Sequence, residues 1–227
     1  IYVDLLNVKH FIDMKPTIRS IEKYVEGKFQ NEGTGHDWFH IDRVRRLALY
    51  IQEREGGNRD LINLAALLHD ISDHKFNGGD FEKGGQEAKA ILERFNIEKE
   101  LIEKVVDIVN TVSFKGNGVA DNMASIEGKI VQDADRLDAI GAIGIARTFA
   151  FGGSIGQPIY SPNIKPSIHK SKEEYQNRTH TINHFYEKLL ILEKRMHTDT
   201  AKSIAKERTE LMKSYLNSFY KEWNFNK

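Results

Sequence analysis

The 227-residue chain carries 33 basic and 33 acidic side chains, so its formal net charge is zero. This balance disfavours nucleic acid as a partner, because binding to a phosphate backbone needs an excess of basic residues. The absence of cysteine excludes disulfides, thiolate nucleophiles and zinc–thiolate sites, and it is compatible with the cytoplasm, where we expect the protein to act. No apolar stretch approaches the roughly 20 residues of a membrane span, so no membrane partner is expected.

Residues 1–15 are expected to form a leader or a disordered N-terminus, since the first methionine is Met14. Residues 16–227 are long enough for one domain with a substantial apolar core. Within them, apolar residues recur at steps of three and four, the period of one helix face. The pattern predicts helices over approximately 16–29, 37–55, 58–69, 88–95, 101–112, 126–140, 182–196 and 204–219.

Helix ends are marked by residues with known capping preferences. Asp37 is a favourable N-cap for the second predicted helix, and Asn58 or Asp60 is one for the third. Gly56-Gly57, which lies between these two helices, is expected to end the second one.

Three segments between the predicted helices are rich in loop-forming residues. Polar stretches with several glycines lie at 72–84 and 113–118. Residues 152–178 contain three of the four prolines, which predicts a long loop inserted between the late helices. No strand pattern and no internal repeat is visible in the sequence. The sequence therefore predicts an all-α fold, a single helical bundle with one long Gly/Pro-rich loop.

A histidine directly followed by an aspartate, His69-Asp70, ends the third predicted helix. Adjacent residues on a helix do not face one way, so the two side chains converge only on an object between them, of which a metal ion is the simplest. His40 lies on the buried stripe of its own predicted helix, and Asp135 lies on a later, acid-rich helix. Two imidazoles and two carboxylates suit Mn²⁺, which we favour, and also Fe²⁺, Co²⁺, Ni²⁺, Zn²⁺ or Mg²⁺.

Three local strings surround these four residues: Gly35-His36-Asp37-Trp38-Phe39-His40-Ile41-Asp42-Arg43-Val44, Leu67-Leu68-His69-Asp70-Ile71 and Ala134-Asp135-Arg136-Leu137-Asp138-Ala139-Ile140-Gly141. The pattern H…HD…D in this setting resembles the HD-domain superfamily of metal-dependent phosphohydrolases. The strings are similar to a small bacterial subfamily that includes nucleoside triphosphate pyrophosphohydrolases. The resemblance covers residues 16–222, nearly the whole chain.

The resemblance implies that His40, His69, Asp70 and Asp135 hold one divalent metal ion within a bundle of helices. It also implies hydrolysis of a phosphate ester or anhydride, with (deoxy)nucleoside triphosphates cut between the α- and β-phosphates as the favoured reaction. A nucleoside 5′-monophosphatase, a cyclic-nucleotide phosphodiesterase and a non-catalytic nucleotide-binding regulatory module stay open as alternatives. The expected partner is a small nucleotide, and a homodimer stays open.

A phosphohydrolase also needs a base for water and cations for the developing charge. Asp73 follows Asp70 by three residues and is the candidate base, while Lys75 is a second candidate catalytic residue that can reach substrate phosphates. Arg43 is three residues beyond His40 and can share its side of the helix. The candidates for binding substrate or its phosphates are Arg43, Lys75, Lys115, Tyr160, His184 and Lys188.

Each candidate also has a plainer interpretation. His40 alone fits a packed core histidine, and Asp135 has Asp133 and Asp138 close by, of which Asp138 can instead support a ligand. Arg43 can pair with Asp42 or Glu26 at the surface, and segment 152–166, with Tyr160, can cover a base or sugar or be a disordered insertion. The residues that also fit ordinary polar positions are Asp73, Lys75, Lys115, His184 and Lys188.

Overall fold

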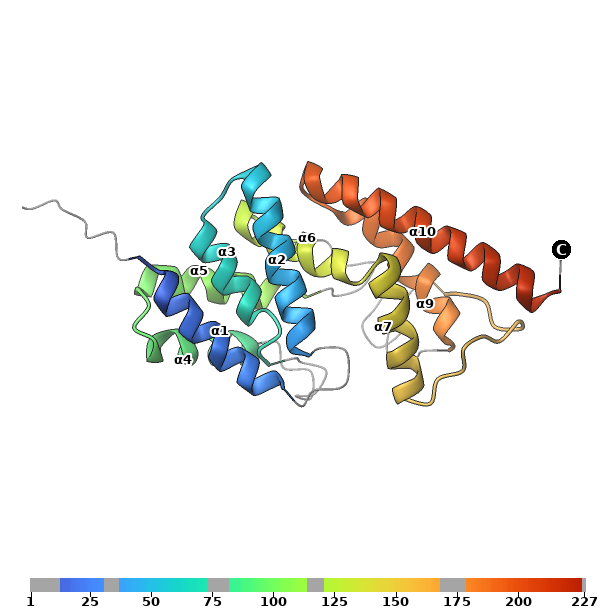
Figure 1. Cartoon of the computed structure of the whole chain (residues 1–227), viewed down its shortest axis with the longest axis horizontal. Helices are drawn as coiled ribbons and strands as arrows, with labels where there is room; N and C mark the ends of the chain where they lie inside the picture. The colour runs from blue at the N-terminus through green and yellow to red at the C-terminus, as the bar shows by residue number, and fades with distance from the viewer. Residues whose placement is uncertain (1–12, 31–36, 73–81, 114–120, 168–178, 226–227) are drawn as a thin grey trace, which may run out of the picture.

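The computed structural model describes residues 13–30, 37–72, 82–113, 121–167 and 179–225 (Figure 1). These described residues form helices joined by turns and contain no strand, which confirms the predicted all-α fold. The helices are α1 (Lys15–Phe29), α2 (Trp38–Glu55), α3 (Arg59–Leu68), α4 (Glu82–Arg94), α5 (Lys99–Thr111), α6 (Ile126–Asp138), α7 (Gly141–Ser154), α9 (Thr181–Glu187), the 3₁₀ helix η1 (Leu189–Arg195) and α10 (Asp199–Trp223).

The helices gather into two groups on either side of a central pair (Figure 1). Helices α2 and α6 pack against each other at the centre, and α3 packs on both of them. On one side α3 contacts α1 and α5, and α4 pairs with α5; on the other side α10 runs along α7 and η1. Helix α3 is therefore enclosed by neighbours, and residues Leu64–Leu68 have no exposed surface.

The predicted caps explain where the central helices begin and end. The Asp37 carboxylate accepts the backbone N–H of His40 at 2.8 Å, which fixes the first turn of α2. Asn58, rather than Asp60, caps α3, since its side chain accepts the N–H groups of Asp60 and Leu61. Gly56 ends α2 with φ +82°. Glycine adopts this conformation with little steric strain, because it has no Cβ. These caps place His40 and His69 at facing helix ends.

Helix α7 is an element that the apolar period did not predict. It spans Gly141–Ser154 and so includes the first three residues of the predicted 152–178 loop. Its outer face carries the exposed Ala142, Ala146 and Ala150, so the contrast between apolar and polar faces that identifies an amphipathic helix is missing. Residues 168–178 of that loop lie outside the described residues.

The single helix predicted over 182–196 is wrong: two shorter helices replace it. Helix α9 ends at Glu187, Lys188 leaves the helical region with φ −138°, and a 3₁₀ helix follows. A 3₁₀ helix aligns residues three apart, and here that period puts Leu189 and Leu192 together on the buried side. The tighter winding thus buries both leucines.

The described residues include no helix that is both long and apolar enough for a membrane span.

Candidate metal centre

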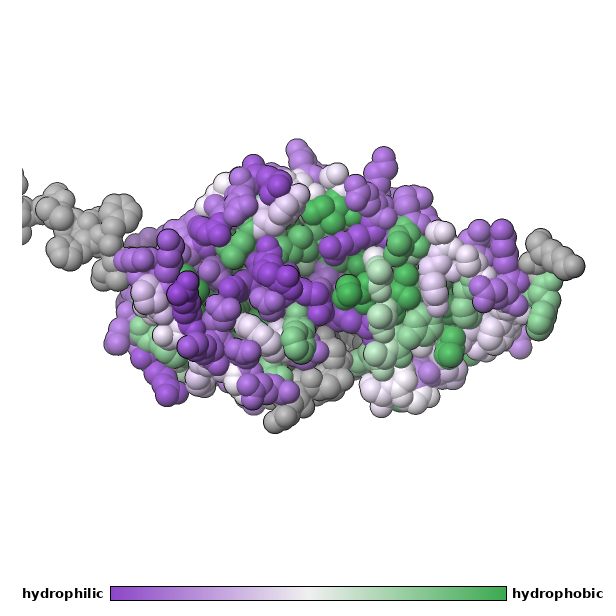
Figure 2. Space-filling model, viewed as in Figure 1, coloured by the Kyte–Doolittle hydropathy of each residue, from purple (hydrophilic) through white to green (hydrophobic). Residues whose placement is uncertain are grey.

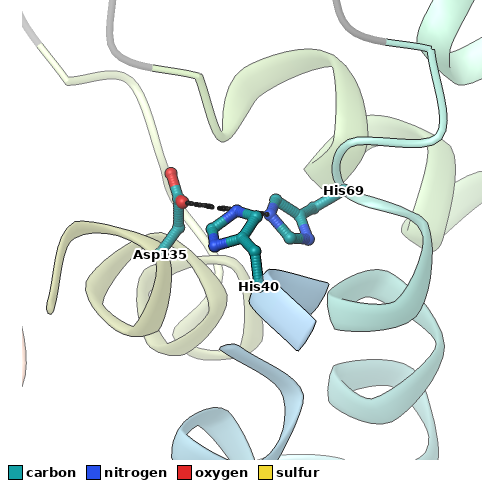
Figure 3. Close-up of side chains that lie close together, drawn as sticks. All are labelled: His40, His69 and Asp135. Atoms are coloured by element: carbon teal, nitrogen blue, oxygen red, sulfur yellow. Dashed lines mark hydrogen bonds and ion pairs between the residues drawn. The ribbon is translucent and has the colours of Figure 1, made fainter. Parts of the chain in front are cut away.

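Four side chains from three helices converge at the centre of the fold. His40 comes from the first turn of α2, His69 and Asp70 follow the last turn of α3, and Asp135 comes from the last turn of α6. Figure 3 shows His40, His69 and Asp135 pointing toward one another. Their ligand atoms lie within 4.8 Å of one another. The fold therefore brings together predicted ligands that are up to 95 positions apart in the chain.

The distances place both imidazoles and both carboxylates around one point. The two histidine Nε2 atoms are 3.3 Å apart. The Asp70 Oδ2 atom lies 3.3 Å from Nε2 of His40 and 3.6 Å from Nε2 of His69. The Asp135 Oδ1 atom lies 3.6 Å and 3.8 Å from the same two nitrogens. Each residue thus turns one nitrogen or oxygen atom to the common point.

The second nitrogen of each imidazole is already committed. His69 Nδ1 lies 2.8 Å from the Ala66 carbonyl oxygen, and a carbonyl only accepts, so this nitrogen carries the proton and donates. His40 Nδ1 lies 2.8 Å from Oδ2 of Asp138 and donates to that carboxylate. With Nδ1 as the donor, each ring turns its Nε2 to the common point, where that nitrogen can offer a lone pair to a cation. Facing lone pairs beside two carboxylate oxygens repel one another unless a cation lies between them.

The burial of the four residues fits a divalent cation that is open on one side. The two histidine side chains are at most 1% exposed, whereas Asp70 is 16% and Asp135 31% exposed. The centre also lies at the C-terminal end of α3, where the helix dipole favours positive charge. Two nitrogen and two oxygen donors suit a borderline divalent ion with coordination positions left for water or substrate. A substrate would approach from the side of the carboxylates.

Asp138 supports the centre from behind His40. Besides His40, it accepts Nε and Nη2 of Arg43 at 2.7 and 3.0 Å and Nη1 of Arg147 at 2.6 Å. Burial opposes ionisation of this carboxyl, but hydrogen bonds from His40 and Arg43 outweigh it and hold the pKa of Asp138 well below its usual range. An ionised Asp138 fixes both the orientation of the His40 ring and which nitrogen carries the proton.

His40 itself has two opposing influences. Burial disfavours the imidazolium, yet hydrogen bonds to the Asp138 and Asp70 carboxylates are stronger and raise the pKa of His40. The positive charge of Arg147 acts in the other direction. The carboxylates that favour a proton on His40 also favour a metal ion bound to it, because a proton and a metal ion both add positive charge to the imidazole ring.

The HD domain family matches residues 38–140. The Bacillus subtilis protein YpgQ is 37% identical over 203 residues, 89% of this chain and 91% of its own. The chain belongs to the HD-domain superfamily of metal-dependent phosphohydrolases.

Solved structures of similar proteins agree with this assignment, and one of them is named an HD-superfamily hydrolase. A Lactobacillus plantarum protein aligns with a TM-score of 0.84 and 36% identity over 95% of this chain and 100% of its own. An HD-superfamily hydrolase of Bacillus thuringiensis aligns with a TM-score of 0.72 and 42% identity, over 92% and 98%. The structure of YpgQ in complex with ADP aligns with a TM-score of 0.70 and 36% identity, over 90% and 97%.

The structure describes only some of the other predicted site residues of this HD domain. Asp73, Lys75 and Lys115 lie outside the described residues. Arg43 shares the side of α2 that carries His40, and its partner is Asp138 rather than Asp42 or Glu26. The predicted role of these residues in the reaction stays a prediction.

Tyr160, His184 and Lys188 lie in the group formed by α7, α9 and α10. Tyr160 is half-buried in an aromatic cluster toward the C-terminal end of α10, where it contacts His180, Phe219, Tyr220 and Trp223. His184 is half-buried on α9, which packs on α7, and Lys188 follows the last residue of α9.

Two arginines next to the centre were not among the site residues predicted from the sequence. Arg147 binds Asp138 from α7. Arg208 on α10 donates from Nη1 to the carbonyl of Leu137 at 2.5 Å and also interacts electrostatically with Asp138. The chain has twelve arginines, and only the packing of α7 and α10 against the end of α6 identifies these two.

A second polar network fixes the other side of α6. Asp133 has no exposed surface, and its carboxylate accepts the N–H groups of His197 and Thr198 and the Thr198 hydroxyl. Thr198 in turn caps α10. This carboxylate therefore ties the start of α10 to α6 two residues before Asp135.

Proposed function

We propose that this protein hydrolyses (deoxy)nucleoside triphosphates to the monophosphate and pyrophosphate, using one divalent metal ion, with Mn²⁺ favoured, held by His40, His69, Asp70 and Asp135. The observation that carries this proposal is the convergence of two Nε2 lone pairs and two carboxylate oxygens, with both Nδ1 atoms already committed. A bound divalent ion would supply Lewis acidity toward a phosphoryl group and toward the attacking water.

The residues of the chain supply orientation and charge around that ion. Asp138 holds the His40 ring so that its Nε2 faces the centre. Asp73 takes the proton of the attacking water, since it follows Asp70 by three residues in the chain. Lys75, Lys115 and Arg43 bind phosphate oxygens. The remaining candidates for contacts with sugar and base are Tyr160, His184 and Lys188.

A relative supports the nucleotide as the substrate class. YpgQ has been crystallised with ADP, and it matches this chain along nearly its whole length. A triphosphate rather than a monophosphate is proposed because the chain carries several cationic candidates, more than a single phosphate requires.

A product assay tests the reaction. The protein is loaded with Mn²⁺, Co²⁺, Ni²⁺ or Mg²⁺, and the products of a nucleotide panel are separated by ion-exchange chromatography. We expect monophosphate and pyrophosphate from triphosphates. Inorganic phosphate from monophosphates, ring opening of cyclic nucleotides, or metal binding without turnover would each replace the proposal by the corresponding alternative.

Two variants and one control test the site. Asp70→Ala is expected to abolish both metal binding and turnover. Asp73→Asn is expected to retain the metal while turnover falls at least a hundredfold, as loss of a general base does. Asp107→Ala removes an exposed carboxylate from α5 and should behave as wild type. Full metal-dependent turnover by Asp70→Ala would show that the site assignment is wrong.

A further inference from the structure

A lysine of α1 reaches the turn that carries Asp70, one of the proposed metal ligands. Helix α3 ends at Leu68, and the N–H of Ile71 donates to the Leu68 carbonyl at 3.1 Å, so the chain turns sharply around His69 and Asp70. Nζ of Lys28 donates to the carbonyl of Ile71 at 3.2 Å. Because Lys28 and Ile71 are 43 positions apart in the chain, this contact depends on the packing of α1 against α3.

Helix α4 also holds this lysine. Lys28 forms an ion pair with Glu87, which joins the last turn of α1 to α4 (Figure 1). The two side chains are 36% and 32% exposed, so water weakens their attraction. Glu87 therefore contributes mainly by directing the ammonium group toward the turn. The hydrogen bond to the Ile71 carbonyl is the contact through which Lys28 acts on the metal centre.

The chain just beyond the turn lies close to the same face of α4. A Cβ placed on Gly84 would lie 3.6 Å from the Ser72 carbonyl oxygen, so the backbone of α4 approaches the backbone that follows Ile71. Gly84 and Glu87 are three residues apart and therefore share one side of the helix. One face of α4 thus approaches Ser72 directly and reaches Ile71 through Lys28.

These contacts hold the backbone on both sides of Asp70. On the preceding side, the His69 ring binds the Ala66 carbonyl. On the following side, Ile71 is 2% exposed, and Lys28 fixes its carbonyl and hence the planar peptide unit to which that carbonyl belongs. Metal–ligand distances tolerate deviations of only about 0.2 Å, so a small rotation of this turn would be enough to weaken coordination by the Asp70 carboxylate.

We propose that Lys28 is a positioning residue for the metal centre: its ammonium group fixes the turn after α3, and so the direction of the Asp70 carboxylate, while Glu87 directs the ammonium group. This inference rests on the proposed function, because Asp70 is a ligand of the metal ion proposed there. Lys28 acts through the backbone and contacts neither the metal ion nor the substrate in this role. Helices α1 and α4 thereby tune the affinity of a centre whose ligands come from α2, α6 and the end of α3.

Titration of the metal-free protein with Mn²⁺, followed by isothermal titration calorimetry, tests this role without any nucleotide. Lys28→Met retains the length and the apolar stem of the side chain but removes the charge and the donor. Groups that orient a ligand contribute about 10- to 100-fold to metal affinity. Since Lys28 acts on the backbone next to Asp70 rather than on its carboxylate, we expect the lower end, binding about tenfold weaker. Lys28→Arg retains a cationic donor and should recover most of the affinity.

Two control variants on α1 separate positioning from a general loss of stability. Lys23→Met removes an exposed lysine from the same helix. Ile21→Val shortens a side chain that has no exposed surface and should lower the urea midpoint, as loss of a buried methylene does. Both should bind Mn²⁺ as wild type does. The electron paramagnetic resonance spectrum of bound Mn²⁺ depends on the symmetry of its ligands, and it should change in Lys28→Met but in neither control.

Three outcomes would overturn the positioning role: wild-type Mn²⁺ affinity in Lys28→Met, equal weakening in Ile21→Val, or no recovery in Lys28→Arg. A higher KM for a triphosphate at unchanged Mn²⁺ affinity would make Lys28 a contact of the substrate instead.

The same measurements distinguish this inference from the proposed function. A protein that releases pyrophosphate, and whose Mn²⁺ affinity depends on Asp70 but not on Lys28, would retain the proposed function and lose the positioning role. A protein whose Mn²⁺ affinity depends on both residues, but which releases no pyrophosphate, would do the reverse. Wild type that bound no Mn²⁺ would overturn both.

Discussion

Replacing Asp138 by asparagine tests the link between the buried charge cluster and the metal centre. The carboxylate accepts four hydrogen bonds, two from Arg43 and one each from His40 and Arg147, at 2.6 to 3.0 Å. Removing one partner of a buried ion pair costs about 3–5 kcal/mol. Since part of each arginine side chain reaches solvent, we expect the lower end, a loss of about 3 kcal/mol in the free energy of unfolding.

The same substitution should weaken the metal centre. An asparagine can orient its oxygen toward the His40 N–H only if its amide group then faces Arg43 or Arg147, so the ring loses its fixed orientation. Groups that orient a ligand typically contribute 10- to 100-fold to metal affinity. We expect a loss of about this size for Mn²⁺ in Asp138→Asn, measured by calorimetric titration, alongside urea denaturation for stability.

Asp199→Asn is the control for both measurements. Asp199 is 91% exposed and pairs with Lys202 one turn along α10. Because an exposed ion pair contributes little to stability, its loss should leave both the unfolding midpoint and the Mn²⁺ affinity unchanged. If Asp138→Asn bound Mn²⁺ within twofold of wild type, the reasoning that Asp138 orients His40 would be refuted.

Three further predictions concern the packing around α6. Thr198→Val removes the hydroxyl that donates to Asp133 at 2.8 Å and caps α10, so urea denaturation should show a loss of about 1–2 kcal/mol; an unchanged midpoint would contradict this. Gly141→Ala places a Cβ at φ +78° and 2.9 Å from Arg208 Cγ, which should cost about 1–3 kcal/mol and lower the melting temperature, unlike Gly153→Ala, whose Cβ would meet nothing within 4 Å. Burial opposes ionisation of Asp121, but an arginine of α6 outweighs it and lowers its pKa; wild type should therefore lose stability relative to Asp121→Asn as the pH falls from about 4, and parallel pH profiles would argue against this.

The central helices could be predicted from the sequence because the capping residues and the apolar periodicity indicate the same helices. The caps Asp37 and Asn58 agree with the apolar period of α2 and α3, and residues Leu64–Leu68 of α3 are fully buried. The convergence of His40, His69 and Asp135 follows from these starts and ends, because each residue lies within one turn of a helix end. Short-range signals were therefore sufficient here.

The elements that the sequence did not predict depend on contacts with distant residues. The exposed alanines of α7 carry no amphipathic signal, and the 3₁₀ winding of η1 depends on which leucines find a buried neighbour. Arg147 and Arg208 are recognisable only once α7 and α10 pack against α6. A single-sequence pattern carries no information about which distant helix an arginine will face.

Asp138 connects the predictable and the unpredictable parts of the site. Its position three residues after Asp135 suggested a supporting role, and the structure adds that it binds His40 on one side and Arg43 and Arg147 on the other. A residue that merely oriented His40 would need a single acceptor, and the Ala66 carbonyl performs that task for His69. An ionised carboxylate also binds Arg43 and Arg147, and so joins α2, α6 and α7 behind the metal centre. The support of His40 therefore depends on the packing of three helices, whereas that of His69 lies within α3 and its C-terminal cap.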